Sequence, residues 1–153
     1  MDKKSVERTE VVSAIEVENI GDSKDNVQPV RIIICGGRHF NDYERLEAVM
    51  NEIVEEYNLS LKDIEIVSGH CEGADRLGEL WASKHGAKCT KFPAEWGKYG
   101  RAAGPIRNTN MVEYVAQSRQ PIVVAFVNER TKGTRDTVRK AQKKGVKVVV
   151  NHY

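Results

Sequence analysis

Long apolar runs are missing from this 153-residue sequence. No stretch approaches the roughly 18 apolar residues that a membrane-spanning helix needs. The charged start MDKKSVERTE is followed by no apolar segment of the kind found in signal peptides. Internal repeats and low-complexity tracts are absent as well. These absences predict an ordinary globular protein without a membrane span, located in the cytoplasm.

Cysteine is scarce and is not arranged in pairs. The three cysteines are odd in number and form no CxxC motif: Cys35, Cys71 and Cys89. A disulfide framework and a structural zinc site are therefore not indicated, and reduced thiols are expected.

Metal and nucleophile motifs are also lacking. His70, Cys71, Glu72 and Asp75 carry metal-compatible groups, but their spacing fits no recognised ligand pattern. Ser68-Gly69 lacks the GxSxG context of a nucleophile elbow. We expect no metal site, no cofactor and no nucleophilic hydrolysis.

Charge is unevenly distributed, although the formal net charge is only +2. Residues 1–29 carry more acidic than basic side chains and end in GDSKDNVQP, whereas the rest of the chain is basic. This shift in composition predicts an acidic N-terminal extension over residues 1–29 and a folded domain over residues 30–153. Within the extension, VVSAIEVENI has two interpretations, an edge strand or a flexible arm.

Short apolar strands alternate with amphipathic helices from Val30 onward. The predicted strands are RIIIC, IEIVSG, KCTKFP, PIVVAF and VKVVV. The first helix is predicted to be capped by Asn41 with Glu44 in a capping-box position, and the second to stop at Gly86. A third helix is expected from about Pro105 and a fourth over TRDTVRKAQKKG. The alternation predicts an α/β fold, a Rossmann-like doubly wound parallel sheet in a single domain.

Glycines and polar residues follow the first four predicted strands. In parallel α/β sheets, ligands bind outside the carboxyl ends of the strands. A backbone N–H approaches a phosphate most closely where no Cβ intervenes, and a helix N-terminus adds about half a positive charge. The predicted nucleotide- and phosphate-binding residues are Gly36, Gly37, Arg38, Ser68, Gly69, Gly73, Asp75, Trp96, Arg107, Asn108, Lys132, Gly133 and Thr134.

Individual roles follow from side-chain chemistry. Arg38 and Arg107 are predicted to clamp phosphate oxygens bidentately. Asp75 is interpreted either as an acceptor for sugar hydroxyls or as a simple N-terminal helix charge. For Trp96 the alternatives are stacking on a base, a role that Tyr99 also fits, and core packing at the end of a strand.

Four segments together resemble a known superfamily: RIIICGGRHF, IVSGHCEGADRLGELWA, FPAEWGKYGRAAGPIRNTNM and VVAFVNERTKGTRDTVRKAQKKGVKV. Over roughly residues 31–150 they resemble the SLOG superfamily, which joins the Lonely Guy and DprA-like Rossmannoid proteins, and in particular its YspA-like, cpYpsA-related branch of bacterial and phage proteins. The resemblance implies a Rossmann-like sheet that binds a nucleotide or nucleotide-derived ligand, in several branches as a sensor. It also implies a homodimer, because Lonely Guy proteins assemble through helices near the site.

Lonely Guy enzymes cleave the N-glycosidic bond of nucleoside monophosphates with an Arg and a Glu from the motifs RKxxM and PGGxGTxxE. Arg107, Asn108 and Met111 match the first motif, with Asn in place of Lys. The second motif is matched only at Gly133 and Thr134. In place of the leading Pro-Gly-Gly, the neighbouring positions hold Glu-Arg-Thr-Lys.

The expected catalytic carboxylate is missing, because Thr137 stands at the Glu position. A carboxylate stabilises the oxocarbenium-like transition state or positions water in glycosidic cleavage. Asp136 is adjacent, but one step along a helix turns a side chain by about 100°. We therefore predict a nucleotide-binding, sensor-type protein. The alternative is a phosphoribohydrolase that uses Arg107 with Asp136 or Asp75.

Basic residues cluster near the end of the sequence, and DprA-like relatives bind single-stranded DNA. Clustered cations attract phosphates, yet most of these residues fall on a predicted helix whose exposed face would ordinarily be charged. A solvated face is expected, with nucleic acid as the alternative partner. The residues are Arg130, Lys132, Arg135, Arg139, Lys140, Lys143, Lys144 and Lys147.

Overall fold

A computed structural model describes residues 29–153 of the chain. The interpretations of VVSAIEVENI, as an edge strand or an arm, and of an acidic extension concern residues that lie outside this described part.

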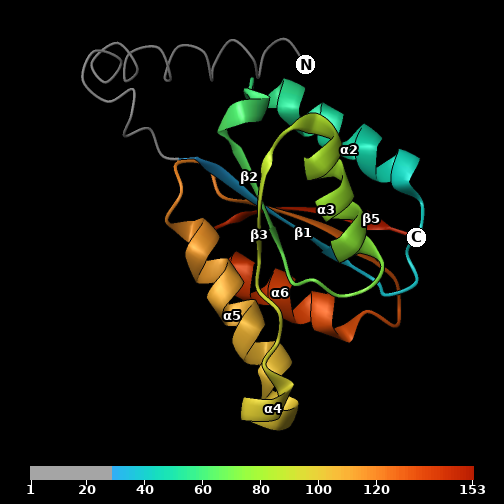
Figure 1. Ribbon diagram of the computed structural model, residues 1–153, viewed down its shortest axis with the longest axis vertical. Helices are drawn as coiled ribbons and strands as arrows, with labels where there is room; N and C mark the ends of the chain where they lie inside the picture. Colours follow the sequence, from blue (N-terminus) through green and yellow to red (C-terminus); the bar gives the residue numbers. More distant parts are fainter. Residues whose placement is uncertain (1–28) are drawn as a thin grey trace.

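Five parallel strands form one sheet in the order β3-β2-β1-β4-β5 (Figure 1). Their bounds are Val30–Gly36 (β1), Ile64–Ser68 (β2), Lys88–Lys91 (β3), Ile122–Val127 (β4) and Lys147–His152 (β5). The central strands are buried almost throughout, as expected for apolar β-branched runs covered on both faces. The predicted Rossmann-like parallel sheet is confirmed.

Helices cover both faces of the sheet. Helices α2 (Tyr43–Glu56) and α3 (Ala74–His85) pack on the face that carries Ile32 and Ile34 of β1. Helices α5 (Ala103–Ala116) and α6 (Lys132–Lys143) pack on the opposite face, against Ile33. Because successive side chains of a strand point to opposite faces, the unbroken run RIIIC supplies both cores. No helix in the described part of the chain has the length and apolar character needed to cross a membrane.

Two of the predicted helix ends can be compared directly with the structure. Asp42, and not Asn41, caps α2, because its Oδ1 accepts a hydrogen bond from the backbone N–H of Arg45 at 3.1 Å. The predicted Asn41–Glu44 pair is therefore wrong by one residue. The stop at Gly86 is confirmed, since Gly86 adopts the left-handed conformation with a φ of 71°.

The segment before Pro105 is more helical than the sequence predicts. The short helix α4 (Trp96–Tyr99) and a 3₁₀ turn (Gly100–Ala102) precede α5, which begins at Ala103. Pro105 thus occupies the first turn of α5, where its missing N–H costs no helical hydrogen bond. In Figure 1, α4 lies away from the sheet, beside the N-terminal end of α5. A further 3₁₀ turn, Leu61–Asp63, leads into β2.

The order of the strands creates a single place for a ligand crevice. From β1 the chain proceeds to β2 and β3 on one side, and then returns to β4 and β5 on the other. The connections after β1 and β4 therefore diverge to opposite faces of the sheet. In doubly wound folds this divergence opens a crevice at the carboxyl ends of the two strands.

Candidate functional site

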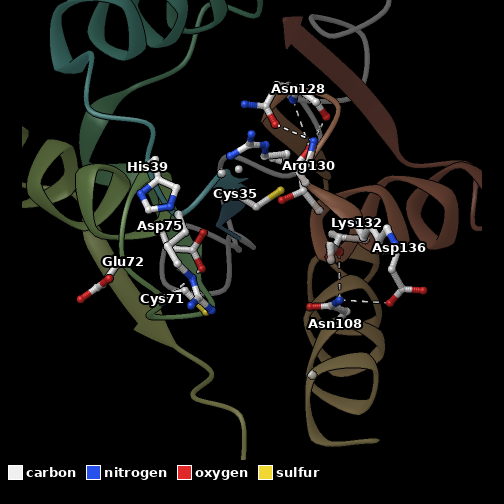
Figure 2. A pocket seen from close by; sticks show the side chains of 18 of the residues that line it. Cys35, His39, Cys71, Glu72, Asp75, Asn108, Asn128, Arg130, Lys132 and Asp136 are labelled. Carbon is white, nitrogen blue, oxygen red and sulfur yellow. Dashed lines mark hydrogen bonds between the residues drawn. The ribbon is translucent and has the colours of Figure 1, made fainter. Parts of the chain in front are cut away.

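A cleft of about 1120 Å³ opens at the carboxyl ends of β1 and β4. Figure 2 shows its two walls: His39, Cys71, Glu72 and Asp75 lie on one side, and Asn108, Lys132 and Asp136 lie on the other. Cys35 lies between the walls, and the loop carrying Asn128 and Arg130 borders the cleft beyond it (Figure 2). The cleft occupies the position that the topology predicts.

Most of the predicted ligand-binding residues line this cleft. They are Gly36, Gly37, Arg38, Asp75, Trp96, Arg107, Asn108, Lys132, Gly133 and Thr134. Arg107, Asp136 and Asp75, named above as candidate catalytic residues, also line it. Segments as far apart in sequence as Gly36 and Thr134 thus meet at one rim.

Ser68, Gly69 and Gly73 do not line the cleft but shape the loops around it. The Ser68 hydroxyl donates to Glu79 at 2.7 Å. Gly73 has a φ of 87°, and a Cβ there would lie 2.1 Å from the carbonyl oxygen of Gly37. A glycine is therefore required for the start of α3 to approach the loop after β1.

Asp75 is a buried carboxyl group on the cleft wall. Only 5% of the residue is exposed, and its Oδ2 accepts a hydrogen bond from the backbone N–H of Cys71 at 3.3 Å. Burial raises the pKa of Asp75 from 3.8 to about 6, against the opposing effects of the Cys71 N–H and of Arg107. Asp75 is thus more than an exposed charge at a helix N-terminus.

Arg107 lines the cleft, but much of its guanidinium is used within the protein. Its Nη1 donates to the Gly69 carbonyl at 2.8 Å, and its Nε donates to the Asn108 side chain at 2.9 Å. Nη1 also lies 3.5 Å from the Phe92 carbonyl. These bonds tie α5 to the loops after β2 and β3, so Arg107 has a structural role whether or not it also contacts a phosphate.

Asn108 and Asp136 join α5 to α6. Asn108 Nδ2 donates to Asp136 Oδ2 at 3.0 Å and to the Gly133 carbonyl at 3.2 Å. Asp136 also forms ion pairs within α6: its Oδ1 lies 2.7 Å from Arg139 Nη2, and its Oδ2 lies 2.9 Å from Lys140 Nζ. Partial burial alone would raise the pKa of Asp136, but the bonds from Lys140 and Asn108 and the charge of Arg139 hold it below the ordinary value. Asp136 is therefore an ionised group already surrounded by donors.

The first turn of α6 faces the cleft with unused donors. Thr131 precedes the helix but its side chain does not cap it; the hydroxyl instead donates to Asn128 O at 3.0 Å. The backbone N–H groups of Gly133 and Thr134 make no hydrogen bond within residues 29–153. Thr134 and Thr137 are 8% and 1% exposed, and their hydroxyls likewise have no partner in this part of the chain. The wall of the cleft therefore carries four polar groups that a ligand can engage.

Trp96 is 58% exposed and lines the cleft, so the core-packing interpretation is wrong. The indole lies against Gly104, where a Cβ would come within 3.4 Å of the ring. Tyr99, from the same short helix, is 39% exposed but does not line the cleft. The difference arises from their positions on α4, which sequence spacing in a loop could not reveal.

Two notable cleft residues, Thr137 and Tyr153, are absent from the predicted ligand-binding residues. In the sequence, Thr137 is notable only as the residue that replaces the expected carboxylate. Tyr153 follows β5, and the rule that ligand-binding residues follow parallel strands would have identified it.

The other expectations concern metals and the basic run. Across residues 29–153, no three His, Cys, Asp or Glu side chains gather in a way that would hold a metal ion. His70 Nδ1 instead lies 2.8 Å from Glu79 Oε2. Most of the predicted basic residues are exposed on or beside α6, whereas Lys140 is partly buried and bonded to Asp136. This arrangement provides a solvated face, and nucleic-acid binding stays a prediction.

Comparison with known proteins agrees with this architecture. The family model described as "YspA, cpYpsA-related SLOG family" matches residues 30–99. The chain is 32% identical over 124 residues to the Gene 61 protein of Mycobacterium phage D29, a match that covers 78% of this chain and 94% of the phage protein. No solved structure matches the chain. The chain belongs to the YspA, cpYpsA-related SLOG family, and this membership indicates nucleotide-related binding or processing.

Proposed function

We propose that the protein binds a nucleotide or another phosphoribosyl ligand in the cleft and acts as a sensor-type binding protein. The observation that carries this proposal is the open first turn of α6, where the N–H groups of Gly133 and Thr134 have no partner in the described part of the chain. Helix N-termini of this kind bind phosphate because their N–H groups and the helix dipole both favour negative charge.

Cations around this turn add to the attraction. Lys132, Arg130 and Arg38 are exposed and line the same cleft. Arginine side chains can hold two phosphate oxygens at once, and Lys132 supplies a point charge at the helix start. A phosphate at this position would have donors from the backbone and from side chains of two loops.

Asp75 fits the sugar of the same ligand. It lies on the wall opposite α6 (Figure 2), and a carboxylate accepts hydrogen bonds from adjacent hydroxyl groups. At neutral pH it is mainly ionised, since its pKa of about 6 lies below 7. The phosphate and the ribose would therefore span the two walls of the cleft.

Binding without turnover is favoured by the chemistry of the α6 wall. Thr137 provides a hydroxyl where glycosidic cleavage would need a carboxylate. Asp136, the neighbouring carboxylate, is held by Asn108, Arg139 and Lys140, which leaves it poorly placed to activate water. The arrangement supports recognition more than hydrolysis.

A phosphoribohydrolase is the second candidate, and Asp75 is the observation that favours it. A buried carboxyl group with a pKa of about 6 lies in the range useful for general acid or base catalysis. Incubation with nucleoside monophosphates and chromatography for released base separates the two candidates. Release of base that is lost in Asp75→Asn would establish turnover, whereas binding without release supports the sensor.

The proposal is tested by comparing nucleoside monophosphates with the matching nucleosides in thermal melts and calorimetric titrations. A ligand at 100 times its dissociation constant should add about 2.7 kcal/mol of stability, and the nucleosides should add much less. Thr134→Val should weaken binding of the phosphate form by about tenfold, because a bond to a charged group contributes about 1.5 to 3 kcal/mol.

Thr109→Val is the matched control. Thr109 lies on α5 and donates to the Pro105 carbonyl, and it does not line the cleft. The control should retain the affinity of the unaltered protein. Equal stabilisation by nucleosides and nucleotides would contradict an anion site at α6.

A further inference from the structure

Two large aromatic side chains remain exposed beside the cleft. Trp96 is 58% exposed and Tyr153 is 40% exposed, and both line it. They come from α4 and from the residue after β5, which are far apart in the sequence. Aromatic rings left open in a ligand cleft are natural stacking surfaces for planar groups.

The contacts of Tyr153 place it beside the start of α6. A Cβ on Gly37 would lie 1.7 Å from the Tyr153 hydroxyl and 3.0 Å from Cγ2 of Thr131. Thr131 is the residue immediately before α6. The ring of Tyr153 packs edge-on against that of Phe40, with the ring centroids 5.0 Å apart. The backbone N–H of Tyr153 donates to the Val127 carbonyl at 3.0 Å. The orientation of the ring is therefore set by the protein.

Trp96 is connected to the same helix start through α5. Gly133, in the first turn of α6, accepts a hydrogen bond from Asn108 of α5. Gly104 lies one helical turn before Asn108, a distance of about 6 Å along the axis. The Trp96 ring rests on Gly104. Contacts thus connect Tyr153 to Thr131 at the start of α6, and they connect Trp96 through Gly104 and α5 to Gly133 in the first turn of that helix.

The size of the cleft agrees with a ligand that reaches both rings. Pockets for drug-sized ligands are about 300 to 1,000 Å³, and this cleft, at about 1120 Å³, is larger. A single nucleotide carries one planar base, so it can stack on one of the two aromatic side chains and leaves the other without a partner.

We infer that the ligand is a dinucleotide, with one ring on Trp96, the other on Tyr153 and the joining phosphates at the first turn of α6. This inference rests on the proposed function, because it assumes that phosphates bind at α6. It adds that the ligand carries a planar ring at each end, and it assigns Tyr153 as a specificity-determining residue.

Calorimetric titration with three adenine probes tests the inference: AMP, ADP-ribose and diadenosine diphosphate. The matching guanine compounds, GMP, GDP-ribose and diguanosine diphosphate, form a second series. ADP-ribose carries two phosphates but one ring, so it separates the effect of phosphate from that of the second ring. The two-ring compound should bind at least about tenfold more tightly than ADP-ribose in one of the series, since stacking on an aromatic side chain contributes on that order or more.

Variants of the two aromatic residues complete the experiment. Trp96→Ala and Tyr153→Ala should each remove the advantage of the two-ring compound, and Trp96→Phe and Tyr153→Phe should restore most of it. Tyr99→Ala is the matched control, because Tyr99 is an exposed aromatic residue of α4 outside the cleft. Thermal melts of every variant verify folding.

The outcomes distinguish the inference from the proposed function. Binding of mononucleotides with no advantage for the two-ring compound in either series overturns the inference alone. An advantage that survives both alanine variants overturns the assignment to Trp96 and Tyr153. Failure of every phosphate compound to bind overturns the proposed function as well.

Discussion

Replacing Asp75 by Asn should stabilise the folded protein at neutral pH. Asp75 is 5% exposed, and burial raises the pKa of its carboxyl group from 3.8 to about 6. A carboxyl group whose pKa is raised on folding binds its proton more tightly in the folded chain than in the unfolded chain. The ionised form of Asp75 therefore opposes folding.

The pH window and the magnitude follow from this pKa difference. Well below pH 3.8 the carboxyl group is protonated in both states, and between about pH 3 and 6 mainly the unfolded chain releases the proton, so stability falls as pH rises. The rise in the pKa of Asp75 from 3.8 to about 6 corresponds to about 3 kcal/mol, at about 1.36 kcal/mol per unit of pKa. Asparagine matches the protonated acid in size and carries no charge. The free energy of unfolding of Asp75→Asn should thus equal that of the unaltered protein near pH 3 and exceed it by about 3 kcal/mol above pH 7.

Urea denaturation across this pH range, followed by the fluorescence of buried Trp81, measures the effect. Glu72→Gln is the control, because Glu72 lines the same cleft but is exposed. It should leave the pH dependence unchanged. An Asp75→Asn variant that keeps the pH dependence of the unaltered protein, or that is less stable above pH 7, would contradict a buried charge that opposes folding. A gain in stability with a loss of nucleotide affinity would show that the buried charge is kept for binding.

Two further predictions concern Arg107 and assembly. Arg107→Ala should lower the stability of the ligand-free protein by about 1 to 3 kcal/mol, because the partly buried Gly69 and Asn108 oxygens lose their donor, and Arg107→Lys should restore only part of it. Urea denaturation together with calorimetric titration of AMP detects both effects; unchanged stability with lost binding would instead support a direct phosphate clamp. The homodimer implied by the family resemblance should give twice the mass of one chain in light scattering at micromolar concentration, and a mass near 17.2 kDa would contradict it.

The alternation of apolar strands and amphipathic helices determined the fold class. Runs such as RIIIC can only be buried on both faces, and the helical patterns between them are long enough to cross over the sheet, so a parallel sheet follows. The rule that ligands bind at the carboxyl ends of such strands then identified Gly36, Asp75 and Gly133 as residues around one cleft. These inferences need only local periodicity and the fixed handedness of the crossovers.

Only the tertiary structure decided which of these residues face the cleft and which are already bonded. Arg107 and Asp136 look equally available in sequence, yet Arg107 donates to the Gly69 carbonyl in the loop after β2. Asp136 accepts from Asn108 of α5, in addition to Arg139 and Lys140 of its own helix. For Trp96 the sequence left core packing and base stacking as alternatives, because its exposure depends on how α4 stands against α5. Contacts between distant segments set hydrogen bonding, burial and pKa, and periodicity along one chain carries no record of them.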